Sequence, residues 1–220
     1  MNDKLLELLC NSLDGSLYDI AVIVHYLYHE TYVVGKLRSK VWFKFENHKW
    51  KQTELGPYYE LSTNVLQIYN DFYKSILNDT ISCDTLLELD ISTNESLNIN
   101  NIRDFALLKC DVINKKLKNV NFKEQICKEC LYLFYNENFI FKLDRNQHLI
   151  CFLNGVFDNN TKEFRDGVPN DYTLMHIDKN YVVHLNEVEC IDFSKLINKF
   201  NSFRNDILKK RTSKNIYKVE

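Results

Sequence analysis

The residues best suited to chemistry are cysteines and histidines at metal-ligand spacing. Cys127-x-x-Cys130 and His148-x-x-Cys151 offer soft ligands at a spacing similar to that of a zinc ribbon. The context argues against zinc, because the first pair lies in a helical apolar pattern and the second pair would face opposite sides of a strand. We therefore predict no metal and no cofactor. A zinc-dependent protein is the least favoured alternative.

Neither nucleophilic catalysis nor phosphate binding has a matching motif. No serine lies in a Gly-x-Ser-x-Gly elbow, and the six histidines are scattered along the chain. The Gly35-Lys36 pair lacks the earlier glycine and the following Ser or Thr of a Walker A loop, since Glu30 and Leu37 occupy those positions. We predict no catalytic residue and no nucleotide hydrolysis by this chain alone.

A Gly/Asn/Asp-rich stretch, FLNGVFDNNTKEFRDG at residues 152–167, follows an apolar run. Asp158, Asp166 and Asp171 in and beyond it could hold a divalent ion, although turn formation is the commoner role of such residues. We interpret the stretch as a structural hairpin with a bend or bulge at Gly155 and a turn at Asn159-Asn160.

Basic residues with an interleaved tryptophan form the candidate for nucleic-acid binding. They are Lys36, Arg38, Lys40, Trp42, Lys44, Lys49 and Lys51. Since alternate residues of a strand share a face, Trp42 and Lys44 would lie together and could contact phosphates and stack on bases. The alternative, which the residues favour slightly, is an ordinary solvated face whose tryptophans pack on neighbouring helices.

Composition limits the classes of protein that the chain can belong to. It has 220 residues, 45% of them hydrophobic, which is enough to form a real core. Its net charge of −2 gives no global electrostatic attraction to nucleic acid or membrane. Seven cysteines, most with apolar neighbours, indicate free thiols in a reducing compartment. We find no signal peptide and no apolar run long enough to span a bilayer. The sequence predicts a soluble intracellular protein.

The pattern of apolar residues predicts an α+β fold that is mainly helical. Helical spacing occurs at residues 16–29, 59–77, 101–118, 122–135 and 192–210. Two small antiparallel β elements are expected, a meander at about residues 31–53 and a hairpin at about 148–165 with strands HLICF, GVFD and KEFR. A polar insertion at about 78–100, with a possible short helix at 83–89, separates the helices.

Three motifs together resemble a known family. The positions are Trp42, Phe45, Asn47, His48 and Trp50; then Asn154, Gly155, Val156, Phe157 and Asp158; then Pro169, Asp171 and Tyr172. Their order and spacing, over most of residues 16–182, resemble the N-terminal collar or linker region that precedes the superfamily 3 helicase module in primase-helicases of poxviruses and other large DNA viruses. Phage and plasmid primases carry a similar region.

The resemblance implies a role in viral-type DNA replication. It implies a collar-like domain at residues 1–190, followed at 191–220 by a helix and polar tail where the helicase would begin. Expected partners are a superfamily 3 helicase module or other replication proteins, and single-stranded or forked DNA, with oligomerisation in that context and no membrane. If the protein is viral, it would act in the host cytoplasm or a virus factory.

We expect the motif residues to be structural, and we predict an accessory, non-catalytic domain. The parent family consists of NTP-hydrolysing helicases and primases, but the chain shows no Walker A, Walker B or arginine finger. We expect a split-gene subunit, a truncated paralogue or an excised domain. The alternative is a free-standing nucleic-acid-binding protein that has lost the motor.

Overall fold

The computed structural model describes residues 2–81, 86, 99–182 and 193–216. The chain forms two compact units. Unit 1 comprises Met1–Trp42 and Thr53–Asn136, and unit 2 comprises Phe43–Gln52 and Glu137–Glu220. The division runs through the second and third strands of the first sheet.

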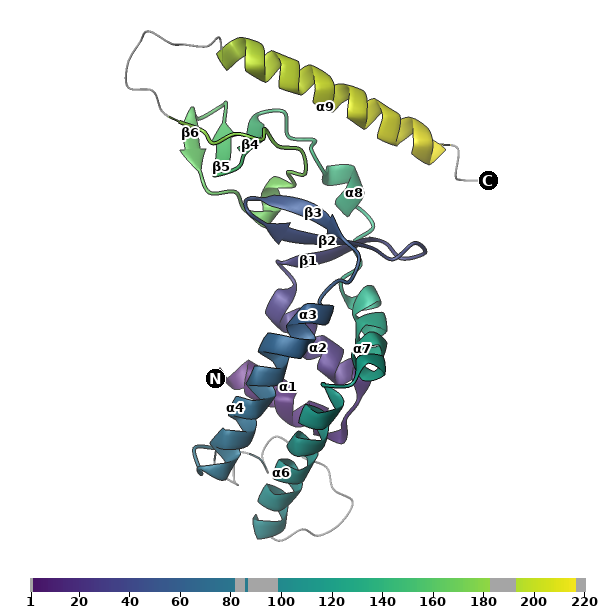
Figure 1. The fold of residues 1–220 in the computed structure, drawn as a ribbon, viewed down its shortest axis with the longest axis vertical. Coiled ribbons are helices and arrows are strands. Elements are labelled where there is room, and N and C mark those ends of the chain that lie inside the picture. Colours follow the sequence, from purple (N-terminus) through teal and green to yellow (C-terminus); the bar gives the residue numbers. More distant parts are fainter. Residues whose placement is uncertain (1, 82–85, 87–98, 183–192, 217–220) are drawn as a thin grey trace. The chain divides into compact units, whose positions relative to one another are not determined.

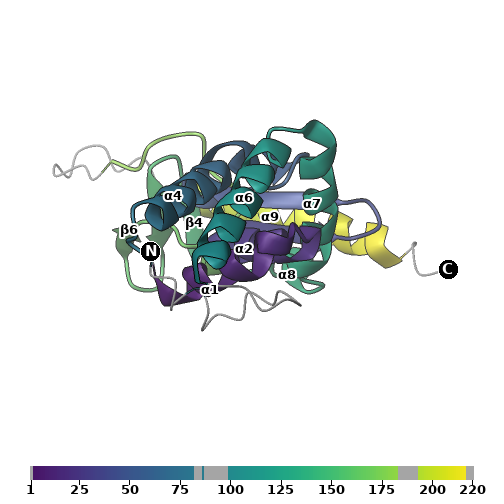
Figure 2. The same ribbon diagram turned by 90° about the horizontal axis from the view of Figure 1, so that it is seen from below.

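Helices dominate unit 1 (Figure 1). They are α1 (Asp3–Asn11), α2 (Leu17–Tyr28), α3 (Tyr58–Glu60), α4 (Leu66–Leu77), α6 (Ile99–Lys116) and α7 (Val120–Leu133). Helix α2 packs along α7, and α4 packs along α6, as the view along the bundle also shows (Figure 2). These two helix pairs enclose the larger hydrophobic core of the protein.

Local sequence explains where three of these helices begin. Asn2, Ser16 and Asn119 precede α1, α2 and α7, and each side chain accepts a hydrogen bond from the backbone N–H three residues later. This bond satisfies one of the donors that a helix start leaves unpaired, at about 1 kcal/mol per cap. Helix α1, which the sequence analysis did not predict, is therefore a capped amphipathic helix that buries Leu9 and Cys10.

The helix predicted at residues 59–77 contains a π-helical segment, Leu61–Val65, between α3 and α4. Its Leu61 and Val65 are fully buried, and Tyr69 in α4 is also buried. The Tyr69 hydroxyl lies 2.6 Å from the Ser12 hydroxyl, which itself donates to the Leu9 carbonyl oxygen at 2.8 Å. Tyr69 therefore donates to Ser12, so the one polar atom of this core ring is satisfied.

The first sheet has the strand order β1 (Tyr32–Lys36), β2 (Val41–Glu46) and β3 (Lys49–Thr53). The β2–β3 turn consists of Asn47 and His48, which both have positive φ, at 50° and 66°. Two left-handed residues give the tight turn whose twist matches paired antiparallel strands, and asparagine tolerates that conformation well. The predicted meander is confirmed.

Unit 2 contains the second sheet, with the order β4 (Leu149–Phe152), β5 (Gly155–Asp158) and β6 (Glu163–Arg165). The strands are antiparallel, with Phe152 opposite Gly155 and Phe157 opposite Phe164. A short helix, α8 (Phe139–Lys142), precedes the sheet, and a 3₁₀ turn, Pro169–Asp171, follows it. The three predicted strands of the hairpin region are confirmed.

Residues 177–181 lie along β4. Ile177 N–H donates to the Cys151 carbonyl oxygen at 2.8 Å, and Leu153 N–H donates to that of Lys179 at 3.1 Å. The Asn154 side chain accepts from Tyr181 N–H at 2.7 Å and donates to the Tyr181 carbonyl at 3.1 Å. The amide thus pairs with the backbone as a strand residue would. This pairing places the Tyr181 ring against Phe164, with centroids 4.5 Å apart.

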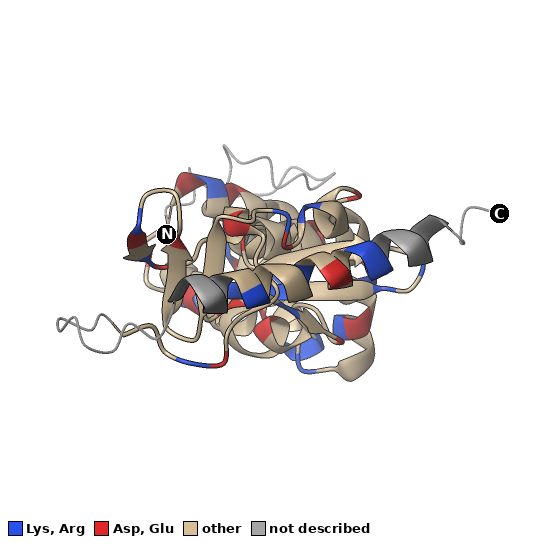
Figure 3. Cartoon of the chain, turned by 90° about the horizontal axis from the view of Figure 1, so that it is seen from above, with Lys and Arg blue, Asp and Glu red and all other residues tan. Residues whose placement is uncertain are grey.

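Helix α9 (Phe193–Ile216) attaches to unit 2 through a buried arginine. Arg204 is 2% exposed and donates to the carbonyl oxygens of Asn146 at 2.8 Å and Leu149 at 3.0 Å. Burial lowers the pKa of Arg204. The hydrogen bonds to the two carbonyl oxygens offset the free-energy cost of burying the guanidinium charge. Basic and acidic residues both lie along the helix in Figure 3.

The predicted α+β, mainly helical class is confirmed, and each long predicted helix is present within a few residues. The predicted domain boundaries remain predictions, as does the insertion at about 78–100, because most of residues 82–98 and all of 183–192 lie outside the described residues. The same holds for the possible helix at 83–89, of which only Leu86 is described. Among the described helices, none combines the length and apolarity that crossing a bilayer requires.

We predict that Gly155→Val destabilises unit 2 by about 2–4 kcal/mol, because it combines overpacking with a strained backbone. Gly155 has φ of +154°, and a Cβ there would lie 2.6 Å from Phe164 Cζ and 2.7 Å from the Arg165 carbonyl oxygen. Thermal unfolding followed by circular dichroism measures the effect. Thr161→Val, at an exposed position of the β5–β6 turn, is the control. Equal melting temperatures for the two variants would contradict the role of Gly155.

Candidate nucleic-acid interface

The predicted basic residues fall into the two units, so each group is described separately. Lys36, Arg38 and Lys40 belong to unit 1, at the end of β1 and in the turn before β2, and all three are exposed. Three cations within five residues on one exposed turn form a local positive surface, which we call the basic turn. Such a surface can contact neighbouring phosphates of a nucleic-acid strand.

Trp42 does not form the exposed stacking surface that was considered from the sequence. Its side chain is 4% exposed. The ring packs edge-on against Phe134, with centroids 5.5 Å apart, and against Tyr32, at 6.3 Å. Burying the indole contributes to the core of unit 1. The faces of this ring are therefore not open to a base.

The remaining predicted cations belong to unit 2. Lys44 and Lys49 are half-buried, whereas Lys51 is exposed and lies 3.4 Å from a Glu46 carboxylate oxygen. An exposed ion pair of this kind contributes little to stability, but it lowers the positive charge available to a phosphate. The basic turn of unit 1 is therefore the stronger candidate surface. Binding of nucleic acid by any of these residues stays a prediction.

The motif residue His48 connects two segments of unit 2 that are far apart in sequence. Its carbonyl oxygen accepts from the Thr173 hydroxyl at 3.1 Å and from the Cys151 thiol at 3.7 Å. Its ring Nδ1 accepts from Gly167 N–H at 3.2 Å. A Cβ on Gly167 would lie 2.5 Å from the His48 carbonyl oxygen, so only glycine permits this close approach.

An Asp166 carboxylate oxygen lies 3.8 Å from the same His48 Nδ1. An ion pair there would require a proton on Nδ1, whereas the bond from Gly167 requires a lone pair. The shorter backbone hydrogen bond and the 90% exposure of the Asp166 side chain favour the unprotonated nitrogen. Asp166 is therefore a solvated residue in this arrangement.

Trp50 completes the connection between the β2–β3 hairpin and the later segment. Its backbone N–H donates to the Thr173 carbonyl oxygen at 2.7 Å, and its indole Nε1–H donates to that of Pro169 at 2.8 Å. The ring is 3% exposed and packs edge-on against Phe139 at a centroid distance of 4.9 Å. The motif tryptophan is thus a buried anchor whose polar atom is satisfied.

Asp171 stabilises the 3₁₀ turn that contains Pro169, whose carbonyl oxygen accepts from Trp50. Arg165 donates to its two carboxylate oxygens at 2.8 and 2.7 Å, and Val168 N–H donates at 2.9 Å. Hydrogen bonding to Asp171, which is 7% exposed, raises the pKa of Arg165. The following Tyr172 adopts a left-handed conformation with φ of 51° and packs on Phe139, with centroids 6.0 Å apart.

The other motif residues form the β4–β5–β6 sheet. Asn154 pairs with the backbone of Tyr181, and Gly155 lies against Phe164 and Arg165. Asp158 accepts from Asn160 N–H at 2.8 Å, which fixes the β5–β6 turn. Each of the three residues thus makes contacts within the sheet or its turn, and their structural role stays a prediction.

The contacts of the aspartates and cysteines also bear on the metal alternative. Asp171 is paired with Arg165, and Asp158 with a turn amide. In α7, burial raises the pKa of Cys127 to about 12 and also raises that of Cys130, which disfavours the thiolates that zinc requires. Among the described residues, no group of three or more His, Cys, Asp or Glu side chains could hold a metal ion.

Sequence reasoning missed two buried polar residues that organise unit 2. Asp144, 3% exposed with φ of 60°, accepts from the N–H groups of Leu174 and Met175 at 2.8 and 2.9 Å. Arg204 binds the carbonyl groups that lead into β4. The turn-prone run Asp144-Arg145-Asn146 is a local signal from which a turn at Asp144 could have been predicted. Nothing in the local sequence distinguished Arg204 from a surface cation of an amphipathic helix.

We predict that Asp171→Asn lowers the free energy of unfolding by about 1–2 kcal/mol, because it removes a charge-assisted bidentate pair that is partly open to solvent. Denaturant unfolding followed by tryptophan fluorescence measures this loss. The matched control is Asp166→Asn, the same change in the same loop, which should shift stability by less than about 0.5 kcal/mol. Equal effects of the two changes would contradict the role given to Asp171.

The chain matches a protein family and is similar to parts of two viral proteins. A family model described as "D5 N terminal like" matches residues 21–209. The chain is 28% identical over 179 residues to "Putative helicase L207/L206" of Acanthamoeba polyphaga mimivirus, which covers 81% of this chain and 18% of that protein. It is 44% identical over 66 residues to "Putative helicase 121R" of Invertebrate iridescent virus 3, covering 30% of this chain and 7% of that protein. The chain thus spans less than a fifth of the length of either relative.

Proposed function

Because this chain belongs to the D5 N terminal like family, we propose that it is the accessory domain of a viral-type replicative DNA primase-helicase. In this role it supports assembly of the helicase module and engages DNA, without catalysing a reaction itself. The observation that carries the proposal is the family match over residues 21–209, which includes all the motif residues described above. Similarity to viral proteins named as helicases supports the association with a helicase module.

The arrangement of the motif residues supports a scaffold. His48, Trp50 and Asp171 are engaged in hydrogen bonds within unit 2. Side chains that are committed to holding backbone segments together are poorly placed to act on a substrate. We therefore assign the motif to the stability of the domain, and DNA engagement to other residues.

The basic turn is our candidate for DNA engagement. Lys36, Arg38 and Lys40 are exposed cations in a chain whose net charge is −2, so any DNA contact must come from a local surface of this kind. Contact with about three phosphates gives weak binding with a strong dependence on salt. For single strands the slope of log K against log salt concentration would be about −2.

A second candidate function, a nucleic-acid-binding protein that acts without a helicase, uses the same basic turn. The two functions differ in their partners. Co-purification of the chain with a superfamily 3 helicase module at a defined stoichiometry supports the accessory domain. DNA binding without any association with the helicase supports the second candidate.

We predict that the combined change Lys36→Glu, Arg38→Glu and Lys40→Glu abolishes binding to single-stranded and forked DNA, because it replaces phosphate contacts by repulsion. Fluorescence anisotropy at low salt measures the affinity. The matched control reverses three other exposed lysines of unit 1, Lys74, Lys115 and Lys118, and changes the net charge equally.

This control should retain most of the affinity, apart from a modest loss through the change in net charge. Equal losses in the two triple variants would show that binding follows net charge alone and would contradict the proposed surface. Absence of DNA binding by the unmodified protein would leave only the assembly role of the proposal.

A further inference from the structure

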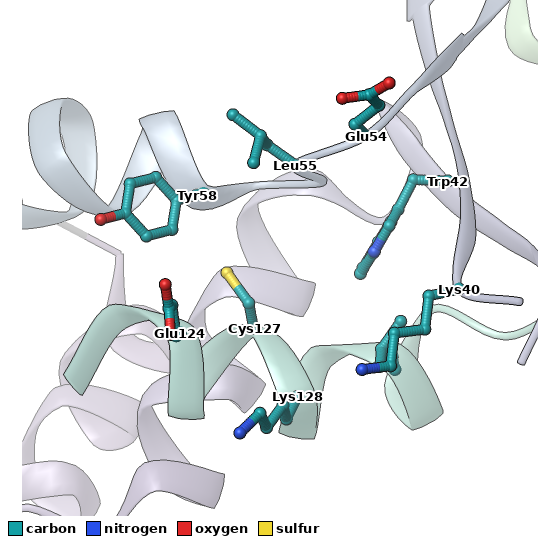
Figure 4. Close-up of a pocket in the computed structure, with 9 residues that line it drawn as sticks. Lys40, Trp42, Glu54, Leu55, Tyr58, Glu124, Cys127 and Lys128 are labelled. Atoms are coloured by element: carbon teal, nitrogen blue, oxygen red, sulfur yellow. The ribbon is translucent and has the colours of Figure 1, made fainter. Parts of the chain in front are cut away.

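A small pocket opens in unit 1 beside the basic turn (Figure 4). Its volume is about 260 Å³. The residues that line it come from the β1–β2 turn, β2, the loop before α3, α3 and α7: Lys40, Trp42, Glu54, Leu55, Tyr58, Glu124, Cys127, Lys128 and Leu131. The pocket thus combines two segments that are about 70 residues apart in sequence with the end of the basic turn.

The interior of the pocket is apolar and partly aromatic. The Cys127 thiol lies between the Tyr58 ring and the Trp42 indole in Figure 4, and the Leu55 side chain stands beside them. Burial raises the pKa of Cys127 to about 12, so the thiol is uncharged at neutral pH. Trp42, which is 4% exposed, contributes only a small area to the lining. A flat, uncharged ring system would find apolar contacts here.

The rim of the pocket is charged. Lys40 and Lys128 are exposed and come from different elements, and Figure 4 shows their side chains on the same side of the pocket. Within the part of the chain that the structure describes, no ion pair to a carboxylate within 4.0 Å is found for either ammonium group. Glu54 and Glu124 supply carboxylate oxygens that can accept from amino groups.

We propose that this pocket receives one unstacked nucleobase of single-stranded DNA, while Lys40 and Lys128 contact the phosphates on either side of that nucleotide. Single-strand binding sites combine these two features, cations along the backbone and apolar or aromatic contacts for the base. The inference rests on the proposed DNA engagement by the basic turn and adds the site for the base.

The size and chemistry of the pocket favour a nucleobase over a larger ligand. Its volume is below the range of about 300–1,000 Å³ that drug-sized ligands occupy. A single base needs one apolar slot, and the exocyclic amino group of adenine, cytosine or guanine can donate to a carboxylate at the rim. The cations continue along the chain from Lys40 to Arg38 and Lys36, so the strand on one side of the base would meet further positive charge.

The experiment compares two fluorescent oligonucleotides of equal length and charge, one with all its bases and one with abasic sites throughout. The unmodified protein should bind the base-bearing strand about tenfold more tightly, because only that strand fills the pocket. Cys127→Phe occupies the pocket without changing charge and should bind both strands equally, at the affinity of the abasic strand. Lys128→Glu should weaken both, whereas Lys118→Glu, at an exposed position before the start of α7, should weaken neither strongly.

A second variant guards against a folding defect in Cys127→Phe. Leu55 is 67% exposed, so Leu55→Ser removes one wall of the pocket at little cost in stability, and it should reduce the preference for the base-bearing strand. Circular dichroism and melting temperature are measured for each variant.

The outcomes separate the pocket from the basic turn. If the unmodified protein binds both strands equally and reversal of the basic turn abolishes this binding, the basic turn engages DNA but the pocket takes no base. If no strand binds at all, the proposed DNA engagement fails together with the pocket. If Cys127→Phe leaves DNA binding intact and instead abolishes association with the helicase module, the pocket receives a protein side chain and the proposal is overturned.

Discussion

The organisation of unit 2 depends on backbone hydrogen-bonding groups that lie inside the unit and must find partners there. The tip of the β2–β3 hairpin and the segment around residues 167–173 are hydrogen-bond partners of each other. His48 and Trp50 contribute acceptors and donors, and Thr173 and Gly167 provide the complementary groups. An unpaired buried polar group costs about 1–3 kcal/mol, so the set is stable only when its members are present together. This interdependence explains why motifs about 120 residues apart form one ordered pattern.

The same requirement explains several residues that sequence reasoning had considered for chemistry. Asp171 is occupied by Arg165 and by the amide of Val168, and Asp158 by the amide of Asn160. Carboxylates used in this way stabilise turns, and no group of three or more candidate ligands for a metal ion is found among the described residues. Unit 1 has a different construction, since its helices are joined by apolar packing around α2, α4, α6 and α7. The cations of its basic turn are exposed.

Much of the fold could be predicted from the sequence because its signals are local. Helical periodicity and turn residues located the long helices and the six predicted strands. The contacts of the motif residues could not be predicted, since His48 meets Gly167 and Trp50 meets Pro169 only through tertiary structure. The burial of Trp42 was open between two interpretations for the same reason, as alternation in a strand does not say which face is covered. The pocket beside Lys40 required α7 and the loop before α3 to converge, and no local pattern indicates that.

We propose that unit 1 engages single-stranded DNA through the basic turn, while the motif residues of unit 2 support the fold. Hydrogen–deuterium exchange of the full chain, with and without a single-stranded oligonucleotide at low salt, tests this proposal. We expect slower exchange at residues 36–42 and 124–131 when DNA is present, and unchanged exchange in the strands at residues 149–158. Protection confined to residues 149–173, or unchanged exchange at residues 36–42 under conditions where DNA is bound, would contradict it.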